Sequence, residues 1–456
     1  MAASSEMNRA MAHSRTDTVN MGEHPEQAGP NSNSRHTRPS GTTDKPRILF
    51  VAEAVTLAHV ARPAVLAQAL DRDVYEVFFA TDPRYNQLFP ELSGFRYDIW
   101  SISSADFLNA LAKGSPLYSK RTLERYVEND LKLIDEIKPD LIIGDFRLSL
   151  SVSARLRQIP YATISNVYWS VYSNNDYPVP QLPMTRFLGV RLSQFLFDLS
   201  RPLAFALHCI PLNSVRRKYG LKSLGYDLRA IYTDADEVLL ADIPDYFPIV
   251  ADARRHRYIG PIPWSPSSRI PSWWNDIDKT RPIVYVTLGS SGRVELLPCV
   301  LEALAQLSVT VIATTAGRAK LASVPDNAMV SEYLPGDEAA GLAALVVCNG
   351  GSLTTYQAIQ NGTPVLGIVS NLDQHLNMSY LSRAGLGEVI RSEEADIQRI
   401  CRLVERLLND RRCTDAAERA RRVSLDYSPR TQFLSFVQEV LSNEQHELEC
   451  RTQASP

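Results

Sequence analysis

The sequence predicts an α/β protein made of two Rossmann-like domains with parallel sheets. With 456 residues, the chain is long enough to bury two or three domain-sized cores. Short apolar runs alternate with helical segments in both halves of the chain, which is the pattern of βαβ units. A proline-rich stretch at 243–281 separates the two series and predicts an interdomain linker.

The first series of elements predicts an N-terminal domain at 45–242. Strands are predicted at 47–52, 74–81, 140–144, 161–165 and 238–241. Helices are predicted at 62–70, through most of 103–138, and at 149–157. An insertion at 168–225 is rich in aromatic and apolar residues and shows no specific motif.

The most apolar part of this insertion, residues 187–212, contains Arg191, Asp198 and Arg201. These charges argue against a membrane-spanning helix, so no integral membrane segment is expected. A partly buried helix is predicted, and an amphipathic helix that faces a membrane or a substrate is the alternative.

The second series predicts a C-terminal domain at 282–424. Its strands are expected at 283–288, 309–314, 328–331, 345–348 and 365–369. Helices follow to about 424, and a terminal helix at 425–445 is expected to cross back to the first domain. Residues 446–456 are predicted to be a flexible tail.

Composition narrows the class of protein. The 48 basic and 51 acidic residues give a net charge of −3, so nothing indicates nucleic acid as a partner. The six cysteines include no Cys-x-x-Cys pair, which argues against disulfides or zinc and favours the cytoplasm. Residues 1–44 are polar and lack the apolar core of a secretion signal, so they are predicted to be a disordered tail.

A glycine turn follows the strand predicted at 345–348. The turn reads Asn349-Gly350-Gly351-Ser352, and a helix is expected to begin near Thr354. Glycines let the backbone approach a phosphate, and the free N–H groups of a first helical turn point at it, so the stretch suits an anion. An ordinary βα loop is the alternative. Asn371, Asp373 and Gln374 follow the next strand, where open α/β sheets bind ligands.

This stretch resembles the donor-sugar signature of the family-1 glycosyltransferases, the UDP-glycosyltransferase superfamily. The matching residues are Gly350, Gly351, Thr354, Gly362, Pro364, Asp373, Gln374 and Asn377. The resemblance implies the GT-B fold, with the active site in a cleft between the two domains. It also implies a nucleotide-sugar co-substrate and no further cofactor. No metal ion is expected, because no carboxylate pair with Asp-x-Asp spacing lies in a loop at the carboxyl end of a predicted strand.

The resemblance assigns catalytic roles to two residues of the first half. His59 follows the first strand and matches the family's general base, although Ala58 replaces a glycine and Pro63 lies one residue late. Imidazole suits this role because its unperturbed pKa near ~6.5 lets it take a proton at neutral pH. Asp145 ends another strand and would orient His59; its alternative role is to cap the helix near Ser149.

The resemblance also assigns donor-binding residues in the second half. Gly289, Ser290 and Ser291 would contact the diphosphate. Tyr333 would stack on the base, and the backbone of Leu334 would read the base edge, although Gly336 replaces a glutamine. The remaining donor-binding residues are Asn349, Gly350, Gly351, Ser352, Thr354, Gln357, Asp373 and Gln374.

Three positions depart from the family signature. Asn349 stands where the family has histidine, so its bond to phosphate would carry no charge. Leu353 replaces glycine or asparagine and is expected to resist an unusual backbone angle. Gln357 replaces a glutamate that accepts bonds from ribose, and it keeps only a neutral carbonyl for this purpose. All three changes are expected to lower donor affinity.

The sequence therefore predicts an inverting glycosyltransferase. His59 would deprotonate a hydroxyl of a small-molecule or lipid acceptor, and a UDP- or dTDP-sugar would be the donor. The alternatives are a non-catalytic member that binds a nucleotide sugar or a partner, and another GT-B enzyme such as an epimerase. Neither the acceptor nor the oligomeric state can be deduced from the sequence.

Overall fold

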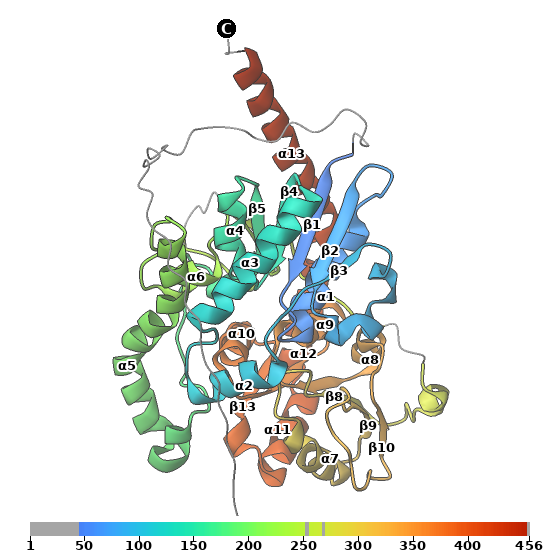
Figure 1. Cartoon of the computed structure of the whole chain (residues 1–456). Coiled ribbons are helices and arrows are strands. Elements are labelled where there is room, and N and C mark those ends of the chain that lie inside the picture. Colours follow the sequence, from blue (N-terminus) through green and yellow to red (C-terminus); the bar gives the residue numbers. More distant parts are fainter. Residues whose placement is uncertain (1–44, 251–254, 267–269, 454–456) are drawn as a thin grey trace, which may run out of the picture. The chain divides into compact units, whose positions relative to one another are not determined.

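The computed structural model describes residues 45–250, 255–266 and 270–453, in which two parallel β-sheets carry the fold (Figure 1). The tail predicted at 1–44 lies outside the described residues.

The first sheet has seven strands in the order β3-β2-β1-β4-β5-β6-β7, and every pairing is parallel. Its strands are β1 (Arg47–Ala52), β2 (Glu76–Thr81), β3 (Arg96–Asp98), β4 (Leu141–Asp145), β5 (Tyr161–Ser165), β6 (Glu237–Leu240) and β7 (His256–Tyr258). The helices of this half are α1 (Leu57–Ala69), α2 (Ser104–Lys113), α3 (Lys120–Ile137), α4 (Leu150–Leu156), α5 (Pro183–Lys218) and α6 (Leu228–Tyr232).

The second sheet has six parallel strands in the order β10-β9-β8-β11-β12-β13. Its strands are β8 (Ile283–Thr287), β9 (Thr310–Thr314), β10 (Ala328–Ser331), β11 (Leu345–Cys348), β12 (Val365–Val369) and β13 (Gly387–Arg391). Its helices are α7 (Leu297–Ala305), α8 (Gly336–Leu342), α9 (Ser352–Gln360), α10 (Leu372–Arg383), α11 (Ile397–Asn409) and α12 (Arg411–Leu425).

Successive apolar side chains of a central strand point to opposite faces of its sheet, so both faces need to be covered. In β1, Ile48 and Phe50 join one apolar cluster, whereas Leu49 and Val51 join another on the opposite face. A parallel strand buried on both faces needs such a continuous apolar run, because successive side chains point to opposite sides. The burial pattern therefore accounts for the runs that predicted the strands.

The terminal helix α13 (Pro429–Gln453) packs on the first sheet. Phe433 and Phe436 lie in the same cluster as Phe50, and Arg257 of β7 pairs with Glu439. Figure 1 shows α13, in red, beside β1 and β2, which begin about 380 and 350 residues earlier in the chain. A further cluster joins the two sheets, with Phe247 stacked on Tyr380 at 4.9 Å between ring centroids.

Several elements differ from the sequence predictions. The stretch predicted to be a linker contains β7, which extends the first sheet beyond β6. The strand β13 was missed inside a segment predicted to be helical. The tail predicted at 446–456 is helical up to Gln453, and residues 454–456 lie outside the described range.

The helix α5 contains residues 187–212 and is partly buried, as predicted. One side packs on the protein, whereas many of its other apolar side chains are exposed. Among the described residues, α5 is the one helix whose length and hydropathy would suit a membrane crossing.

Candidate functional site

Each sheet has one point where the strand order reverses, and the candidate site lies at these two points. In the first sheet the reversal falls between β1 and β4, and in the second it falls between β8 and β11. The segments that leave such neighbouring strands run to opposite sides, which opens a crevice at the carboxyl edge of the sheet. A cavity of about 790 Å³ is lined by residues from both edges.

His59 belongs to the first turn of α1, which begins at Leu57. The sequence had placed it in the loop before the helix. Its Nδ1 lies 2.8 Å from Oδ1 of Asp145, the last residue of β4, because β1 and β4 pair with Ala52 opposite Asp145. When Nδ1 donates this hydrogen bond, Nε2 carries no proton and can accept one.

Asp145 is fully buried, and its carboxylate contacts His59 instead of capping a helix. The N-cap of α4 is Ser149, so the capping alternative is wrong. The ring of His59 keeps 20% of its surface exposed and stacks on Phe146, with centroids 4.7 Å apart. Phe146 has a φ of +57°, a strained angle for a bulky residue.

Arg62 is a buried cation that the sequence analysis missed. Its Nε and one terminal nitrogen each donate to Asp145 at 2.8 Å, so that Asp145 is held in a bidentate ion pair. Burial lowers the pKa of Arg62, but the attraction of Asp145 more than offsets this, and the pKa lies above its ordinary value. The spacing of His59 and Arg62, three residues apart on one helix, was the available signal.

A chain of buried polar groups continues from Arg62 to the second domain. Arg62 donates to Asn166 at 2.7 Å, and Asn166 donates to Asp242 at 2.9 Å. Tyr356 of α9 also donates to Asp242, at 2.8 Å. Burial raises the pKa of Asp242 to about 6, although its hydrogen bonds oppose the shift. His59 and the helix α9 are thus joined by side-chain hydrogen bonds.

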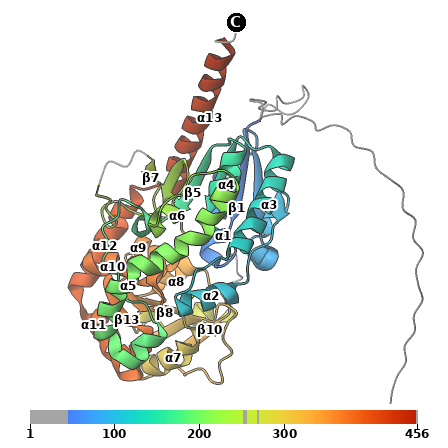
Figure 2. The same cartoon turned by 60° about the vertical axis from the view of Figure 1, so that its left-hand side comes forward.

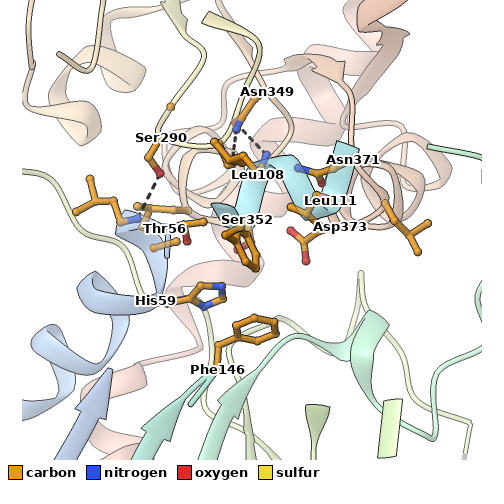
Figure 3. Close-up of a pocket in the computed structure, with 18 of the residues that line it drawn as sticks. Thr56, His59, Leu108, Leu111, Phe146, Ser290, Asn349, Ser352, Asn371 and Asp373 are labelled. Carbon is orange, nitrogen blue, oxygen red and sulfur yellow. Dashed lines mark hydrogen bonds between the residues drawn. The ribbon is translucent and has the colours of Figure 1, made fainter. Parts of the chain in front are cut away.

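At the second switch point, the turn after β11 presents backbone groups and neutral side chains. The glycine turn after β11 leads directly into α9, whose N-cap Gly351 provides no side-chain cap. The N–H groups of this first turn therefore have no helical partner and can bind an anion. Figure 3 shows His59 and Phe146 on one side of the cavity, with Ser352, Asn349 and Asp373 opposite.

Gly350 is required by the packing beneath the turn. Its φ is +76°, and a Cβ there would lie 2.6 Å from Cγ of Met378. Gly350 is not among the residues that line the cavity, so its role is to let the turn form.

Asn349 stabilises the same turn through its amide. It donates to Oγ of Ser291 at 3.2 Å and accepts from the N–H of Gly351 at 3.2 Å. Ser290 accepts a bond from the N–H of Leu57 at 3.3 Å, which joins the two switch points. Gly289, Ser290 and Ser291 all line the cavity.

The other two departures from the family signature are Leu353 and Gln357, and both belong to α9. Leu353 lies in the first turn of α9 without a positive φ, so the expected conflict with the backbone does not occur. Gln357 donates to the carbonyl of Trp264 at 2.8 Å and to Ser265. Gly336 makes room for this amide, because a Cβ there would lie 2.6 Å from Nε2 of Gln357.

Asp373 and Gln374 have different roles. Asp373 lines the cavity and accepts a bond from the indole of Trp169 at 2.8 Å. Gln374 is buried in a capping box with Asn371 and does not line the cavity. The predicted contact of its side chain with the sugar is therefore not supported, whereas Asn371 does line the cavity.

The remaining predicted residues, Tyr333, Leu334, Ser352 and Thr354, also line the cavity. Arg318 lines it too and was missed; its guanidinium donates to the carbonyls of Gly289 and Gly292. Within the described part of the chain, no group of three potential metal ligands is clustered.

One end of the cavity is apolar. Its walls come from α2, α5 and α6 together with the segments after β4 and β5, and the residues are Phe107, Leu108, Leu111, Phe146, Trp169, Phe197, Phe205, Leu228 and Tyr232. No single motif encodes this wall, because residues far apart in sequence form it.

Comparisons with known proteins agree with this arrangement. Residues 298–431 match the family model described as "Erythromycin biosynthesis protein CIII-like, C-terminal domain". A "PGL/p-HBAD biosynthesis rhamnosyltransferase" of Mycobacterium bovis is 53% identical over 373 residues, which are 82% of this chain and 83% of the relative. A "PGL/p-HBAD biosynthesis glycosyltransferase" of Mycobacterium tuberculosis is 50% identical over 85% of this chain and 91% of its own length.

A third relative carries the name "Inactive PGL/p-HBAD biosynthesis glycosyltransferase", from Mycobacterium bovis. It is 49% identical over 61% of this chain and 76% of its own length. Among solved structures, the spinosyn forosaminyltransferase SpnP superposes with a TM-score of 0.64 at 19% identity, over 88% of this chain and all of that one. The spinosyn rhamnosyltransferase SpnG complexed with thymidine diphosphate gives 0.61 at 20% identity, over 86% and 99%.

Proposed function

The chain belongs to the family-1 glycosyltransferases of the GT-B fold, and from this premise we propose that it is an inverting rhamnosyltransferase with an apolar acceptor. The relative that is 53% identical carries the name rhamnosyltransferase, which supports rhamnose as the sugar. The observation that carries the mechanism is the position of His59 and the start of α9 in one cavity.

In this mechanism His59 is the catalytic base. Its Nε2 takes the proton from the acceptor hydroxyl, while Asp145 holds Nδ1 and so fixes the orientation of the ring. The acceptor oxygen then attacks the anomeric carbon, and the bond from that carbon to the diphosphate breaks on the opposite face. The products are a glycoside of inverted configuration and a nucleoside diphosphate.

The leaving group is stabilised by the second switch point. The N–H groups at the start of α9 and the hydroxyls of Ser290 and Ser291 line the cavity and would donate to the diphosphate as charge develops on it. Arg318 contributes a cation at this loop, which partly replaces the charge that Asn349 lacks. Oε1 of Gln357 is the acceptor for a ribose hydroxyl, because Nε2 is held by Trp264.

The acceptor binds at the apolar end of the cavity. Aromatic and aliphatic side chains from α2, α5 and α6 line this end, and such a wall recognises an apolar body with one hydroxyl directed at His59. A lipid or aromatic alcohol fits this description, whereas a strongly hydrated sugar acceptor does not.

The test is to incubate the full chain with nucleotide sugars and acceptors. The donors are the dTDP and UDP forms of rhamnose and glucose, and the acceptors are alkylphenols and alkanols of increasing chain length. Mass spectrometry detects the glycoside, and NMR gives its anomeric configuration. Transfer from a rhamnose donor with inversion is expected.

His59→Ala should reduce turnover by about 10²-fold or more and leave donor binding unchanged. His208→Ala is the matched control, because His208 lines the same cavity but its Nδ1 bonds to the carbonyl of Ala204. Equal turnover in wild type and His59→Ala would contradict the assigned base. If calorimetry detects no binding of any nucleotide sugar, the proposed function fails.

A further inference from the structure

The outer side of α5 carries an apolar stripe that no other described element covers. We define the outer stripe as Leu192, Phe195, Leu199, Leu203, Leu207 and Ile210. Successive members are three or four residues apart, so they lie along one side of the helix. Leu199 is 74% exposed and Phe195 67%. Figures 1 and 2 both show α5, in green, with no helix or strand on its outer side.

The inner side of α5 is part of the protein core and of the cavity. Phe197, Ala204, Phe205 and His208 line the cavity, and Cys209 joins a buried cluster with residues of α3 and α4. Because this side is packed against protein, α5 cannot be surrounded by lipid, as a spanning helix would be. The helix instead packs against protein on one side and leaves an apolar stripe exposed on the other.

The charges of α5 indicate what covers the stripe. The helix contains six basic residues and one acidic residue, whereas the whole chain has a net charge of −3. Arg191 lies exposed at one end of the stripe and Arg217 at the other, and the exposed Arg186 precedes a kink at Gly189. Among the described residues, none of these three arginines has an acidic partner, whereas the acidic Asp198 is paired with Arg201.

We infer that the outer stripe inserts into the headgroup region of an anionic lipid bilayer, with the arginines at its ends contacting the headgroups. An apolar stripe of roughly 27 Å flanked by basic residues is the form of an interfacial helix. A second copy of the chain fits less well. Two stripes packed together would bring like-charged arginines into proximity in either orientation.

The inference deepens the proposed function, because membrane binding would bring the protein to a lipid acceptor. This consequence for the substrate rests on the proposed function. The opposite side of the same helix lines the apolar end of the cavity, so a lipid acceptor held in the bilayer would have a short path to His59. Membrane binding itself does not depend on catalysis, and the two can therefore be tested separately.

The experiment is a vesicle flotation assay with the full chain. One vesicle is phosphatidylcholine alone, and the other contains about one third phosphatidylglycerol. The wild type should float with the anionic vesicles, and added salt should weaken the binding. Phe195→Gln, Leu199→Gln and Leu203→Gln together should reduce binding by at least about tenfold.

The matched control places three glutamines at exposed apolar positions outside α5, namely Val74, Val324 and Leu425. This variant should bind the vesicles as the wild type does, and both variants should bind dTDP equally well in calorimetry. Wild-type protein that ignores anionic vesicles, or a stripe variant that still binds them, would overturn the inference. A dimer that the stripe substitutions abolish, without vesicle binding, would assign the stripe to a second copy instead.

The dTDP measurement separates this inference from the proposed function. If the stripe variant loses vesicle binding but still binds dTDP, the outer stripe binds the membrane independently of the donor site. If the wild type binds neither dTDP-sugars nor UDP-sugars, the transferase proposal fails and the inference about membrane binding is unaffected.

Discussion

At the first switch point three ionisable side chains meet, whereas at the second the backbone and neutral amides do. His59, Asp145 and Arg62 are held by side-chain hydrogen bonds of 2.8 Å. The turn around Gly350 is held by the shape of the chain and by the amide of Asn349. The order of the central strands, 3-2-1-4-5-6 within each sheet, is the same in both cases.

The difference shows how one topology supports two tasks. A proton acceptor must have a defined tautomer and position, and a buried carboxylate provides both. A diphosphate carries its own charge, and several N–H groups at a helix start can bind it without a countercharge. The first site should therefore be sensitive to charge, and the second should be sensitive to backbone shape.

The largest expected effect tests the charge balance at the first site. Arg62→Met leaves Asp145 buried without its cation, and the free energy of unfolding should fall by about 3–5 kcal/mol. Arg318→Met is the control at the second site. Its guanidinium is exposed and bonds only to carbonyls, so less than about 1 kcal/mol should be lost. Urea denaturation of both variants provides the comparison.

A double variant sharpens this test. Adding Asp145→Asn to Arg62→Met removes the unpaired charge, so part of the lost stability should return. If the double variant is less stable than Arg62→Met alone, shape rather than charge holds the first site together.

The sequence indicated His59, Asp145 and the glycine turn but not the network around Arg62, and the reason is physical. Gly350 and Gly351 lie next to each other in one turn, so local sequence carries the geometry. Arg62, Asn166 and Asp242 come from three separate segments and meet only when β1, β4, β5 and β6 assemble. No local pattern encodes such a network.

Other errors have similar causes. The strand β13 begins with Gly387 and includes two charged residues, and it was missed because an edge strand needs no continuous apolar run. Gln374 matched the family signature, but its side chain caps its own helix, which the motif alone does not reveal. The partial burial of α5 was predicted, but the side that stays exposed was not, because apolar content does not indicate which partner covers it.

The next effect tests backbone shape at the second site. Gly350→Ala places a methyl group 2.6 Å from Met378 at a positive φ, and the strain should cost about 1–3 kcal/mol. Affinity for dTDP should fall with it, because the turn must shift. Gly351→Ala is the matched control, since its φ is −75° and the nearest atom lies 3.4 Å away. Calorimetry should find a much larger loss for Gly350→Ala; equal losses would show that the shape of this turn is not special.

The smallest expected effect asks whether charge can still improve the second site. Asn349 lines the cavity, so Asn349→His would place an imidazole where the family signature has one. A charge-assisted bond to the diphosphate should add about 1 kcal/mol, or roughly fivefold in affinity. The gain should be larger below about pH 6.5, where more of the imidazole is protonated.

Calorimetry with dTDP at pH 5.5 and pH 8 measures this gain in affinity, with Asn349→Ala as the baseline for losing the bonds to Ser291 and Gly351. An affinity that matches Asn349→Ala at both pH values would mean that the phosphate lies out of reach of position 349. The hydroxyls of Ser290 and Ser291 and the start of α9 would then hold the anion without help from a side-chain charge at that position, and the second site would depend on its backbone even more than the comparison suggests.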